Sequence, residues 1–307
     1  MLSGRSFKIF SLSKRKYHMK RLRFLLIEQS RKENHKDLVR TIEKMGHRAY
    51  WFRLDAVTVT TGEKGSVAFF GGIPLSEFDI VLPRTVSSNL RLGRFVIRLC
   101  HQKQFVLDRI ICERDTFGKL SQANTLLSAG IRHPETLFTN NLGELKKHLK
   151  QIGFPCIAKP IVGSQGRGVR LIKSYPEALQ TFPTLKEDYV FQRYIPISFD
   201  YRIFVVGNRV LGAMKRYVVA NDVRSNASLG ARTEAVTISK SMEKLAIKAT
   251  EAFGYDVAGV DIIEAENSLF VLEVNRTPQW QGLKKALSIK PEEAIIEMCI
   301  KKHASLQ

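Results

Sequence analysis

The sequence has few cysteines and no long apolar run. The four cysteines, Cys100, Cys112, Cys156 and Cys299, lie far apart and form no CxxC pair. This spacing argues against a zinc site or a disulfide framework and favours a reducing cytoplasm. No apolar stretch reaches the roughly 18–20 residues that a membrane-spanning helix needs. We therefore expect a cytoplasmic protein that does not cross a membrane.

Acidic residues are scarce relative to basic ones, with 29 Asp and Glu against 49 Lys and Arg and a net charge of +20. Eight of the basic residues fall in residues 1–23, which contain no acid, so about +12 remains on the rest of the chain. Such a basic body suggests a partner rich in phosphate or carboxylate. The alternative is a basic surface that serves solubility alone.

Residues 1–19 form a basic leader or tail that we expect to be disordered. The segment resembles a transit peptide in its Ser, Lys and Arg content but lacks the apolar core of a secretory signal. Translation starting at Met19 is an alternative, because MKRLRFLLIE leads directly into a strand. We favour a dispensable tail or a later start over a targeting segment.

Strand-like apolar runs and helical patterns alternate in the first third of the chain. Strands are expected at Arg23–Glu28, Tyr50–Leu54, Val67–Phe70, Phe78–Leu82 and Phe105–Leu107, and helices at Asn34–Met45 and Ser88–His101. This alternation predicts a small open α/β domain over residues 20–113.

The remainder begins with helices and then becomes rich in strands. Helical patterns cover Thr116–Ala129, Ser241–Phe253 and a stripe formed by Leu142, Leu145, Leu149 and Ile152. Strands are expected at Thr136–Phe138, within Tyr189–Met214, and at Val257–Ile263 and Leu269–Asn275. Gly207-Asn208 predicts a two-residue hairpin turn. The fold class is therefore α/β, with an α+β character toward the C-terminus.

The last predicted strand, LFVLEVN, carries two polar residues inside an apolar run. Alternation along a strand places Val271, Glu273 and Asn275 on one face. The other face then holds Phe270, Leu272 and Val274. Glu273 and Asn275 should therefore project together.

A third polar residue, Asp261, interrupts the apolar run VAGVDII of the preceding strand. If Glu266–Ser268 form a three-residue turn, Asp261 lies directly across from Glu273. Carboxylates this close in an apolar hairpin repel one another unless a cation neutralises them. With Asn275, they form an oxygen-only set that suits Mg²⁺ or Mn²⁺. The alternative is an exposed hairpin face with solvated carboxylates.

The stretch KPIVGSQGRGVRLI places Gly163, Gly166 and Gly168 between two strand-like runs. Glycines let backbone N–H groups approach phosphate oxygens. The stretch is not a P-loop, which requires GxxxxGK[ST] before a helix, so the loop joins two strands and can act as a flap. Lys159 just before it and Lys119 from the preceding helix can supply cations. An ordinary hairpin turn is the alternative.

Arginines follow in the strand-rich region. Asp200 and Arg202 share a strand face, and Arg216, Arg224 and Asn226 come after the hairpin. Arginine suits bidentate capture of carboxylate or phosphate. A nucleic-acid patch or a solvated basic face is the alternative, but aromatic residues are not interleaved with these arginines as single-strand stacking requires.

Taken in order, these pieces resemble the ATP-grasp superfamily, and within it the RimK-type α-L-glutamate ligases (ribosomal protein S6 modification protein-like). The resemblance runs from about Arg114 to Lys290 and rests on AKPIVGSQGRGV, FQRYI, DYRIFVVGNRV, RSNASLGA, DVAGVDII and LEVNRTPQWQGL. It implies an ATP-grasp fold after a pre-ATP-grasp α/β domain. The central subdomain would cover residues 114–190 and the C-terminal one, with the metal and substrate site, residues 191–307.

The resemblance also implies site roles. ATP phosphates would be contacted by Lys119, Lys159 and the loop residues Gly163, Ser164, Gln165, Gly166, Arg167 and Gly168. Asp200 would hold the ribose, and the adenine would bind backbone atoms of the hinge formed by Gln192, Arg193, Tyr194 and Ile195. Two Mg²⁺ or Mn²⁺ ions would be held by Asp261, Glu273 and Asn275. Substrate carboxylates and the transferring phosphoryl group would contact Arg202, Arg216, Arg224 and Asn226.

Three residues depart from the family pattern. Arg193 stands where RimK-type enzymes often have an acid, but a hinge that works through backbone atoms tolerates this change. Lys215 stands where many relatives have an acid, and Tyr217 where some have a second arginine. We expect both near the acceptor site, which puts a ribosomal substrate in doubt.

The function implied is that of an ADP-forming ligase that makes an amide through an acyl phosphate. The amine would be that of glutamate, and the acceptor a protein C-terminus, a glutamate chain or an acidic cofactor. One alternative is a ligase for another amine, of the lysine-biosynthesis or short-peptide type. Another is a nucleotide- or ribosome-binding module without turnover. Nucleic acid would be contacted only through a ribosomal acceptor, and a homodimer or homotetramer is expected.

Overall fold

The computed structural model describes residues 20–29, 33–63, 65–86, 89–114, 118–163, 166–185, 188–218 and 232–307. Four of the predicted site residues lie outside this part of the chain, as does the basic leader: Ser164, Gln165, Arg224 and Asn226. Across these ranges, no helix is both long and apolar enough to cross a bilayer. All four cysteines are free thiols.

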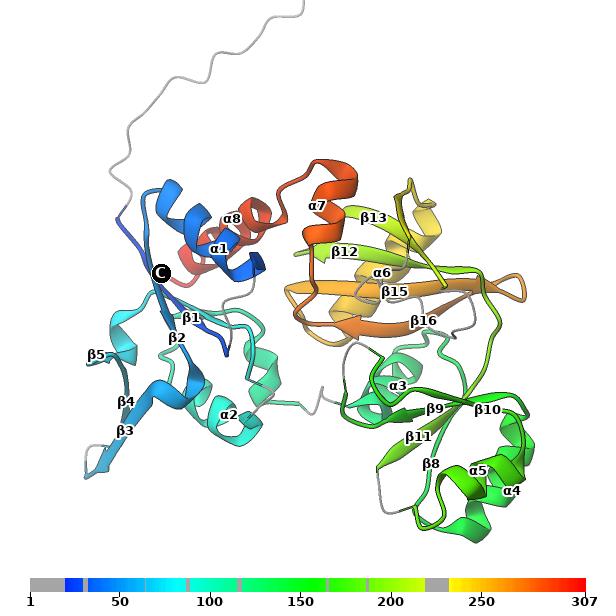
Figure 1. Cartoon of the computed structure of the whole chain (residues 1–307). Helices are drawn as coiled ribbons and strands as arrows, with labels where there is room; N and C mark the ends of the chain where they lie inside the picture. The colour runs from blue at the N-terminus through cyan, green and yellow to red at the C-terminus, as the bar shows by residue number, and fades with distance from the viewer. Residues whose placement is uncertain are drawn as a thin grey trace, which may run out of the picture.

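The N-terminal domain is built on a parallel sheet of order β2-β1-β6-β7 (Figure 1). Its strands are β1 (Arg23–Ile27), β2 (Arg48–Phe52), β6 (Ile80–Pro83) and β7 (Phe105–Val106), and its helices are α1 (Glu33–Lys44) and α2 (Leu90–Arg98). Helix α1 lies on the sheet because Leu38 and Ile42, one turn apart, are fully buried. A small antiparallel sheet projects from the domain and comprises β3 (Val57–Gly62), β4 (Gly65–Phe70) and β5 (Ile73–Pro74). The open α/β domain expected from the sequence is thus present.

An antiparallel sheet of order β10-β9-β11-β8 forms the centre of the chain. It contains β8 (Thr136–Phe138), β9 (Cys156–Pro160), β10 (Arg170–Ile172) and β11 (Tyr189–Arg193), with helices α4 (Leu142–Ile152) and α5 (Tyr175–Thr181). The stripe on α4 packs inward through Leu145, Leu149 and Ile152, whereas Leu142 at its first turn is exposed. The subdomain boundary expected between residues 190 and 191 falls within β11, because the chain leaves this sheet only after Arg193.

A larger antiparallel sheet of order β14-β13-β12-β15-β16 follows. Its strands are β12 (Phe199–Val206), β13 (Arg209–Tyr217), β14 (Thr233–Ala235), β15 (Val257–Ala265) and β16 (Ser268–Asn275). Helices α6 (Lys240–Ala252) and α3 (Lys119–Ser128) pack on this part of the molecule, and α7 (Gln281–Leu287) follows β16. The predicted turn at Gly207-Asn208 is confirmed, because Val206 pairs with Arg209.

The last helix, α8 (Pro291–Ala304), returns to the N-terminal domain and packs beside α1 (Figure 1). Its residues Ile295, Ile296 and Cys299 are fully buried in one apolar cluster with Phe24 and Leu38 of the first strand and helix. The two ends of the described chain therefore share a core.

Candidate active site

A cleft of about 490 Å³ is lined by residues of the central sheet and of the larger sheet. It brings together every predicted site residue that the structure describes except Gly168: Lys119, Lys159, Gly163, Gly166, Arg167, Gln192, Arg193, Tyr194, Ile195, Asp200, Arg202, Arg216, Asp261, Glu273 and Asn275. Gly168 has φ +73°, and a Cβ there would approach Pro160 Cγ to 2.8 Å. This glycine therefore serves a close approach to β9 rather than lining the cleft.

The two carboxylates of the predicted metal set face each other across neighbouring strands. Asp261 of β15 pairs with Glu273 of β16, as expected. The expected turn was wrong, because Ala265 pairs with Ser268 and leaves the two-residue turn Glu266–Asn267, both with positive φ. A β-bulge after Asp261 adds the missing residue and restores the expected pairing.

The bulge also changes which side chains share a face. Val271 and Val274 both lie in the core cluster that includes residues of α6, whereas Leu272, Glu273 and Asn275 all line the cleft. The strict alternation expected for this strand was therefore wrong at Val271 and Leu272, and right for the two polar residues. The bulge therefore places the apolar side chain of Leu272 next to Glu273 in the lining of the cleft.

Arginines neutralise the acids at the floor of the cleft. Arg202 Nη2 donates to Asp261 Oδ2 at 2.8 Å, and its Nε contacts the other carboxylate oxygen. Arg216 donates to both oxygens of Asp200, at 2.7 and 2.6 Å, and its Nη2 also lies 2.9 Å from Asp261 Oδ2. Burial by itself would raise the pKa of Asp261, but the two arginines outweigh it and hold that pKa below its usual value.

The donor set fits a hard divalent cation. With its amide oriented to satisfy both neighbours, Asn275 donates to Glu273 Oε1 at 2.9 Å and accepts from Arg202 Nη2 at 3.3 Å. Asp261, Glu273 and Asn275 thus offer oxygen ligands side by side, which is what Mg²⁺ or Mn²⁺ requires. Within the described ranges, no cluster of three or more His, Cys, Asp or Glu is arranged to hold a metal. The metal role of this mixed carboxylate–amide set stays a prediction.

Cations line the wall of the cleft formed by β9 and the start of α3. The backbone N–H of Lys119 donates to the Ile161 carbonyl at 2.9 Å, which fixes the first turn of α3 against the residue that follows β9. Lys159 lies on β9 before the glycine loop, and burial together with the nearby Lys119 lowers its pKa to about 8. Two ammonium groups held this close favour an anionic ligand between them.

Apolar side chains line the cleft at the segment between β11 and β12. Ile195 of that segment is buried in a cluster with Ile263, and Leu272 packs against the cluster. Ile157 of the central sheet and Met214 of β13 line the same cleft. Of these five residues only Ile195 was predicted, as part of the hinge. The other four were not, because each lies in an apolar run that is equally typical of a core strand. Their arrangement suits a flat aromatic ring such as a nucleobase.

Comparison with known proteins identifies the family. A model of the RimK-like ATP-grasp domain matches residues 116–299. The chain belongs to the RimK-like ATP-grasp family. It is 31% identical over 272 residues to a probable alpha-L-glutamate ligase of Rhodopirellula baltica, covering 85% of this chain and 66% of that protein. It is 32% identical over 273 residues to probable alpha-L-glutamate ligase 1 of Shewanella sp. (strain ANA-3), covering 85% and 89%.

Solved structures share the fold. The macrocyclase MdnC of Microcystis aeruginosa MRC, bound with the precursor peptide MdnA, aligns with a TM-score of 0.71 at 19% identity, over 92% of this chain and 100% of that one. The ATP-grasp ligase PsnB, complexed with a minimal precursor, Mg and ADP, aligns with a TM-score of 0.70 at 20% identity, over 92% and 98%. The protein is an ATP-grasp ligase, and its architecture is the expected ATP-grasp fold.

Two departures from the family pattern lie away from the cleft of the ligase. Met214 and Arg216 of β13 line the cleft, whereas the intervening Lys215 lies over the Phe199 ring with Nζ 4.4 Å from its centroid. Tyr217, on the same side as Lys215, donates to Glu234 at 2.8 Å. Lys215 and Tyr217 therefore do not line the cleft, since strand alternation turns both to the other face, and their place near the acceptor site stays a prediction.

The third departure, Arg193, forms a salt bridge with Glu266 at 3.1 Å, and its backbone N–H donates to the Glu135 carbonyl at 2.9 Å. The hinge thus has no free charge at this position. Asp200 is buried and held by Arg216 on both oxygens, so its contact with a ribose stays a prediction.

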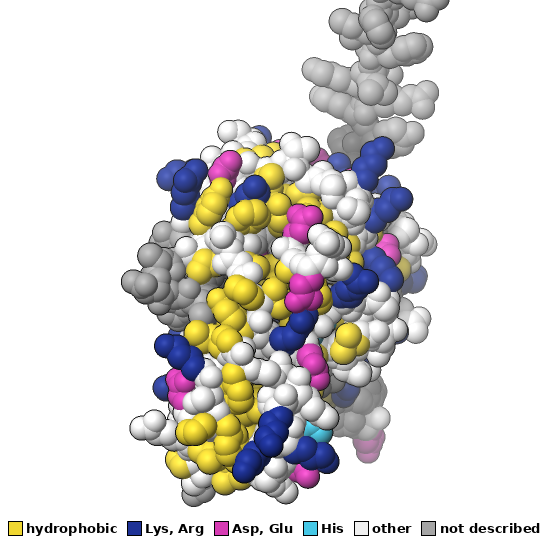
Figure 2. Space-filling view, turned by 90° about the vertical axis from the view of Figure 1, so that its right-hand side faces the viewer, with side chains coloured by type: hydrophobic (Ala, Val, Ile, Leu, Met, Phe, Trp, Pro, Cys, Tyr) yellow, Lys and Arg dark blue, Asp and Glu magenta, His cyan; other side chains and the backbone are white. Residues whose placement is uncertain are grey.

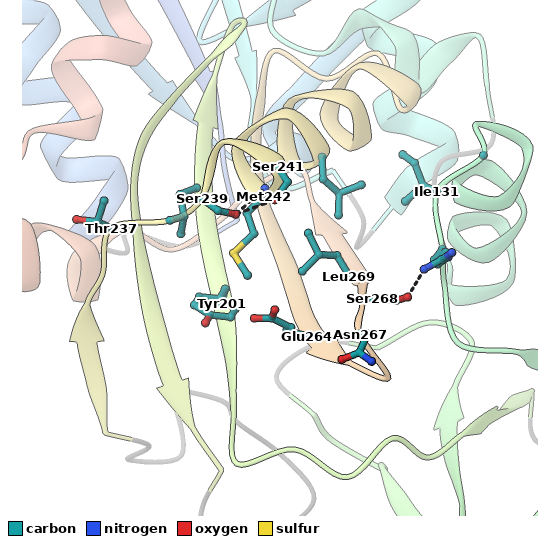
Figure 3. A pocket seen from close by; sticks show the side chains of 14 residues that line it. Ile131, Tyr201, Thr237, Ser239, Ser241, Met242, Glu264, Asn267, Ser268 and Leu269 are labelled. Carbon is teal, nitrogen blue, oxygen red and sulfur yellow. Dashed lines mark hydrogen bonds between the residues drawn. The ribbon is translucent and has the colours of Figure 1, made fainter.

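A second hollow, of about 680 Å³, lies beside the N-terminus of α6 (Figure 3). Its lining includes Tyr201, Glu264 and the hydroxyl groups of Ser239 and Ser241, which bond to each other at 2.8 Å. It contains no paired acids and no lysine, so it does not suit a nucleotide with its metal ion. The cleft is therefore the better candidate for the active site.

Basic residues do not form a single patch on the face of the ligase shown in Figure 2, where Lys and Arg are dispersed among acidic and apolar side chains. On this face the high net charge does not translate into the continuous basic stripe expected of a nucleic-acid-binding protein.

Proposed function

We propose that the ligase binds ATP with Mg²⁺ in the cleft and joins the amino group of glutamate to a carboxylate of an acidic acceptor. The observation that carries this proposal is the pairing of Asp261 with Glu273, with Asn275 beside them, in a cleft that also contains Lys119 and Lys159. Glutamate as the amine is supported by the relatives described above, which are named probable alpha-L-glutamate ligases.

The lining of the cleft supports a site for each part of ATP. In this proposal the base binds among Ile157, Ile195 and Leu272, and the phosphates bind between the two lysines and the glycine loop. The carboxylates and amide of β15 and β16 would hold the metal ions, two in number by the resemblance to the family. Bound Mg²⁺ would supply positive charge to the phosphate oxygens, which is the main requirement of phosphoryl transfer.

The reaction has two steps. A carboxylate oxygen of the acceptor attacks the γ-phosphorus, and the bond to the β-phosphate oxygen breaks, which gives an acyl phosphate and ADP. The amine nitrogen of glutamate then attacks the acyl carbon, phosphate leaves, and the nitrogen loses a proton to form the amide. The described residues of the cleft supply charge and orientation for these steps, as expected where positioning contributes most.

Arg202 and Arg216 would hold the reacting anions. Both donate to Asp261, and Arg202 also lies next to Asn275. A cation bound by Asp261 would compete with these arginines and leave their donors available for the acceptor carboxylate or the transferring phosphoryl group. Arg224 and Asn226 retain the same predicted role. An acidic acceptor, such as a protein C-terminus, a glutamate chain or a cofactor, matches the basic charge of the chain.

Mass spectrometry of the purified enzyme with ATP, Mg²⁺ and glutamate tests the proposal. An ATP-dependent ladder spaced by glutamyl residues is the expected result, with one ADP released per bond. Glu273→Gln should abolish ADP release, whereas Glu264→Gln, on the exposed part of β15, should not. If glutamate and a panel of other amino acids and acidic acceptors all leave ADP undetected, or if Glu273→Gln keeps full turnover, the proposal is wrong.

A further inference from the structure

A chain of hydrogen bonds leads from β16 to the ammonium of Lys159. His133 Nδ1 lies 2.8 Å from the Val271 carbonyl oxygen, and His133 Nε2 lies 2.9 Å from Gln192 Nε2. The amide oxygen of Gln192 then accepts from Lys159 Nζ at 2.6 Å. His133 and Gln192 are both buried, so no bulk water replaces these partners.

The chain has one consistent direction. A carbonyl oxygen only accepts, so His133 Nδ1 carries the proton that bonds to Val271. Burial lowers the pKa of His133 to about 4, so the ring is neutral near neutral pH and its Nε2 is an acceptor. That nitrogen therefore accepts a hydrogen bond from the amide nitrogen of Gln192, which leaves the amide oxygen facing Lys159.

A second acceptor supports the same orientation of Gln192. Its Nε2 also donates to Thr136 Oγ1 at 2.9 Å, and that hydroxyl donates in turn to the Pro134 carbonyl. If the amide flipped, its oxygen would face the lone pair of His133 Nε2, and its N–H groups would face the ammonium of Lys159. The hydroxyl of Thr136 can rotate to donate, but the imidazole cannot, so His133 is the group that disfavours the flip.

We propose that His133 is a positioning residue that fixes the amide of Gln192 so that its oxygen holds the ammonium of Lys159 in the nucleotide cleft. The expected effect on ATP rests on the proposed function, and the effect on Lys159 does not. The other charged groups that act on Lys159 are Lys119, Glu273 and Asp261, and none of them is changed in the variants below.

Two substitutions of His133 separate positioning from simple stability. In His133→Asn, the side-chain amide can donate to the Val271 carbonyl, as Nδ1 does, but does not reach Gln192. In His133→Gln, the amide oxygen can accept from Gln192, as Nε2 does, but Val271 loses its donor. Each variant forfeits one buried hydrogen bond, so we expect similar losses of thermal stability.

The first readout is the dissociation constant of MgATP near neutral pH. His133→Asn should weaken binding about fivefold to tenfold, because the released amide no longer holds the phosphate-binding lysine in place. His133→Gln should restore affinity to within about threefold of the wild type. The second readout is the titration of the Lys159 Cε resonance in ¹³C-lysine-labelled protein, assigned by its loss in Lys159→Met. Its midpoint should fall in the Asn variant and not in the Gln variant.

The outcomes separate the two proposals. Equal weakening of MgATP binding in both variants, with an unchanged Lys159 titration, would show that His133 is only structural. If the wild type binds no MgATP while the Lys159 titration shifts as expected, the proposed function fails and the positioning role stands. If neither variant folds, ¹⁵N spectra of the wild-type His133 ring decide the matter: a protonated Nε2 overturns the inference, and an unprotonated Nε2 supports it.

Discussion

Replacing Arg216 by lysine tests the buried ion network beneath the cleft. The guanidinium makes three charge-assisted contacts of 2.6–2.9 Å, two with Asp200 and one with Asp261. Arg216 Nη2 by itself contacts both carboxylates, but a lysine side chain ends one bond short of that position, so we expect its single ammonium to lose at least two of these contacts. Hydrogen bonds to charged groups contribute about 1.5–3 kcal/mol each, and breaking a buried pair costs about 3–5 kcal/mol. Because lysine keeps the charge, we expect a loss of about 3 kcal/mol.

Thermal unfolding followed by calorimetry measures this loss. In domains of 150–250 residues, 1 kcal/mol moves Tm by about 2–4 °C, so Arg216→Lys should melt about 6–12 °C lower than the wild type. Arg209→Lys is the matched control, since it makes the same change on an exposed site of the same strand and should stay within about 0.5 kcal/mol. Asp200→Asn added to Arg216→Lys should cost less than the two changes made separately. Equal Tm values for Arg216→Lys and Arg209→Lys would refute the reasoning.

Three further predictions concern the cleft. Leu272→Ala should raise the KM for ATP about tenfold with a smaller effect on kcat, because it removes one apolar wall of the base site; an unchanged KM would place the base elsewhere. MgATP affinity should fall as pH rises through about 8, because Lys159 loses its proton there; in Lys159→Arg, binding titrations between about pH 7 and 9 should show a flat profile. Gly259→Ala should lower kcat about tenfold or more, since a Cβ would come within 2.7 Å of Pro278 Cβ and 3.2 Å of Arg202 Cδ; steady-state kinetics equal to the wild type would contradict this.

The sequence predicts that Asp261 and Glu273 lie opposite each other, but it does not predict the turn and the bulge that produce this pairing. The positions of Asp261 and Glu273 were predicted through a three-residue turn, and the actual turn is one residue shorter. A bulge near Leu272 compensates, and bulges follow from tertiary packing rather than from alternation. The same bulge explains why Leu272 was not predicted to line the cleft while Glu273 and Asn275 were.

Two other features depend on contacts that no local pattern reveals. Helix α8 buries one face, formed by Glu292, Ile295, Ile296 and Cys299, and the charged Glu292 interrupts the apolar stripe that a sequence pattern would show. His133 belongs to a short segment without regular structure, and its partners Val271 and Gln192 lie 138 and 59 residues away. A histidine in such a segment has no recognisable role until the chain is folded.

The return of α8 to the first domain bears on how this ligase can be divided. The family match ends at residue 299, inside α8, and begins after the whole N-terminal sheet. A fragment cut to the matched region would retain Ile295 and Ile296 but lose Phe24, Leu38 and the rest of the surface that covers them. Such a fragment would expose the apolar face of α8, and we expect it to self-associate. The N-terminal domain and the matched region must therefore be expressed and mutated as one unit.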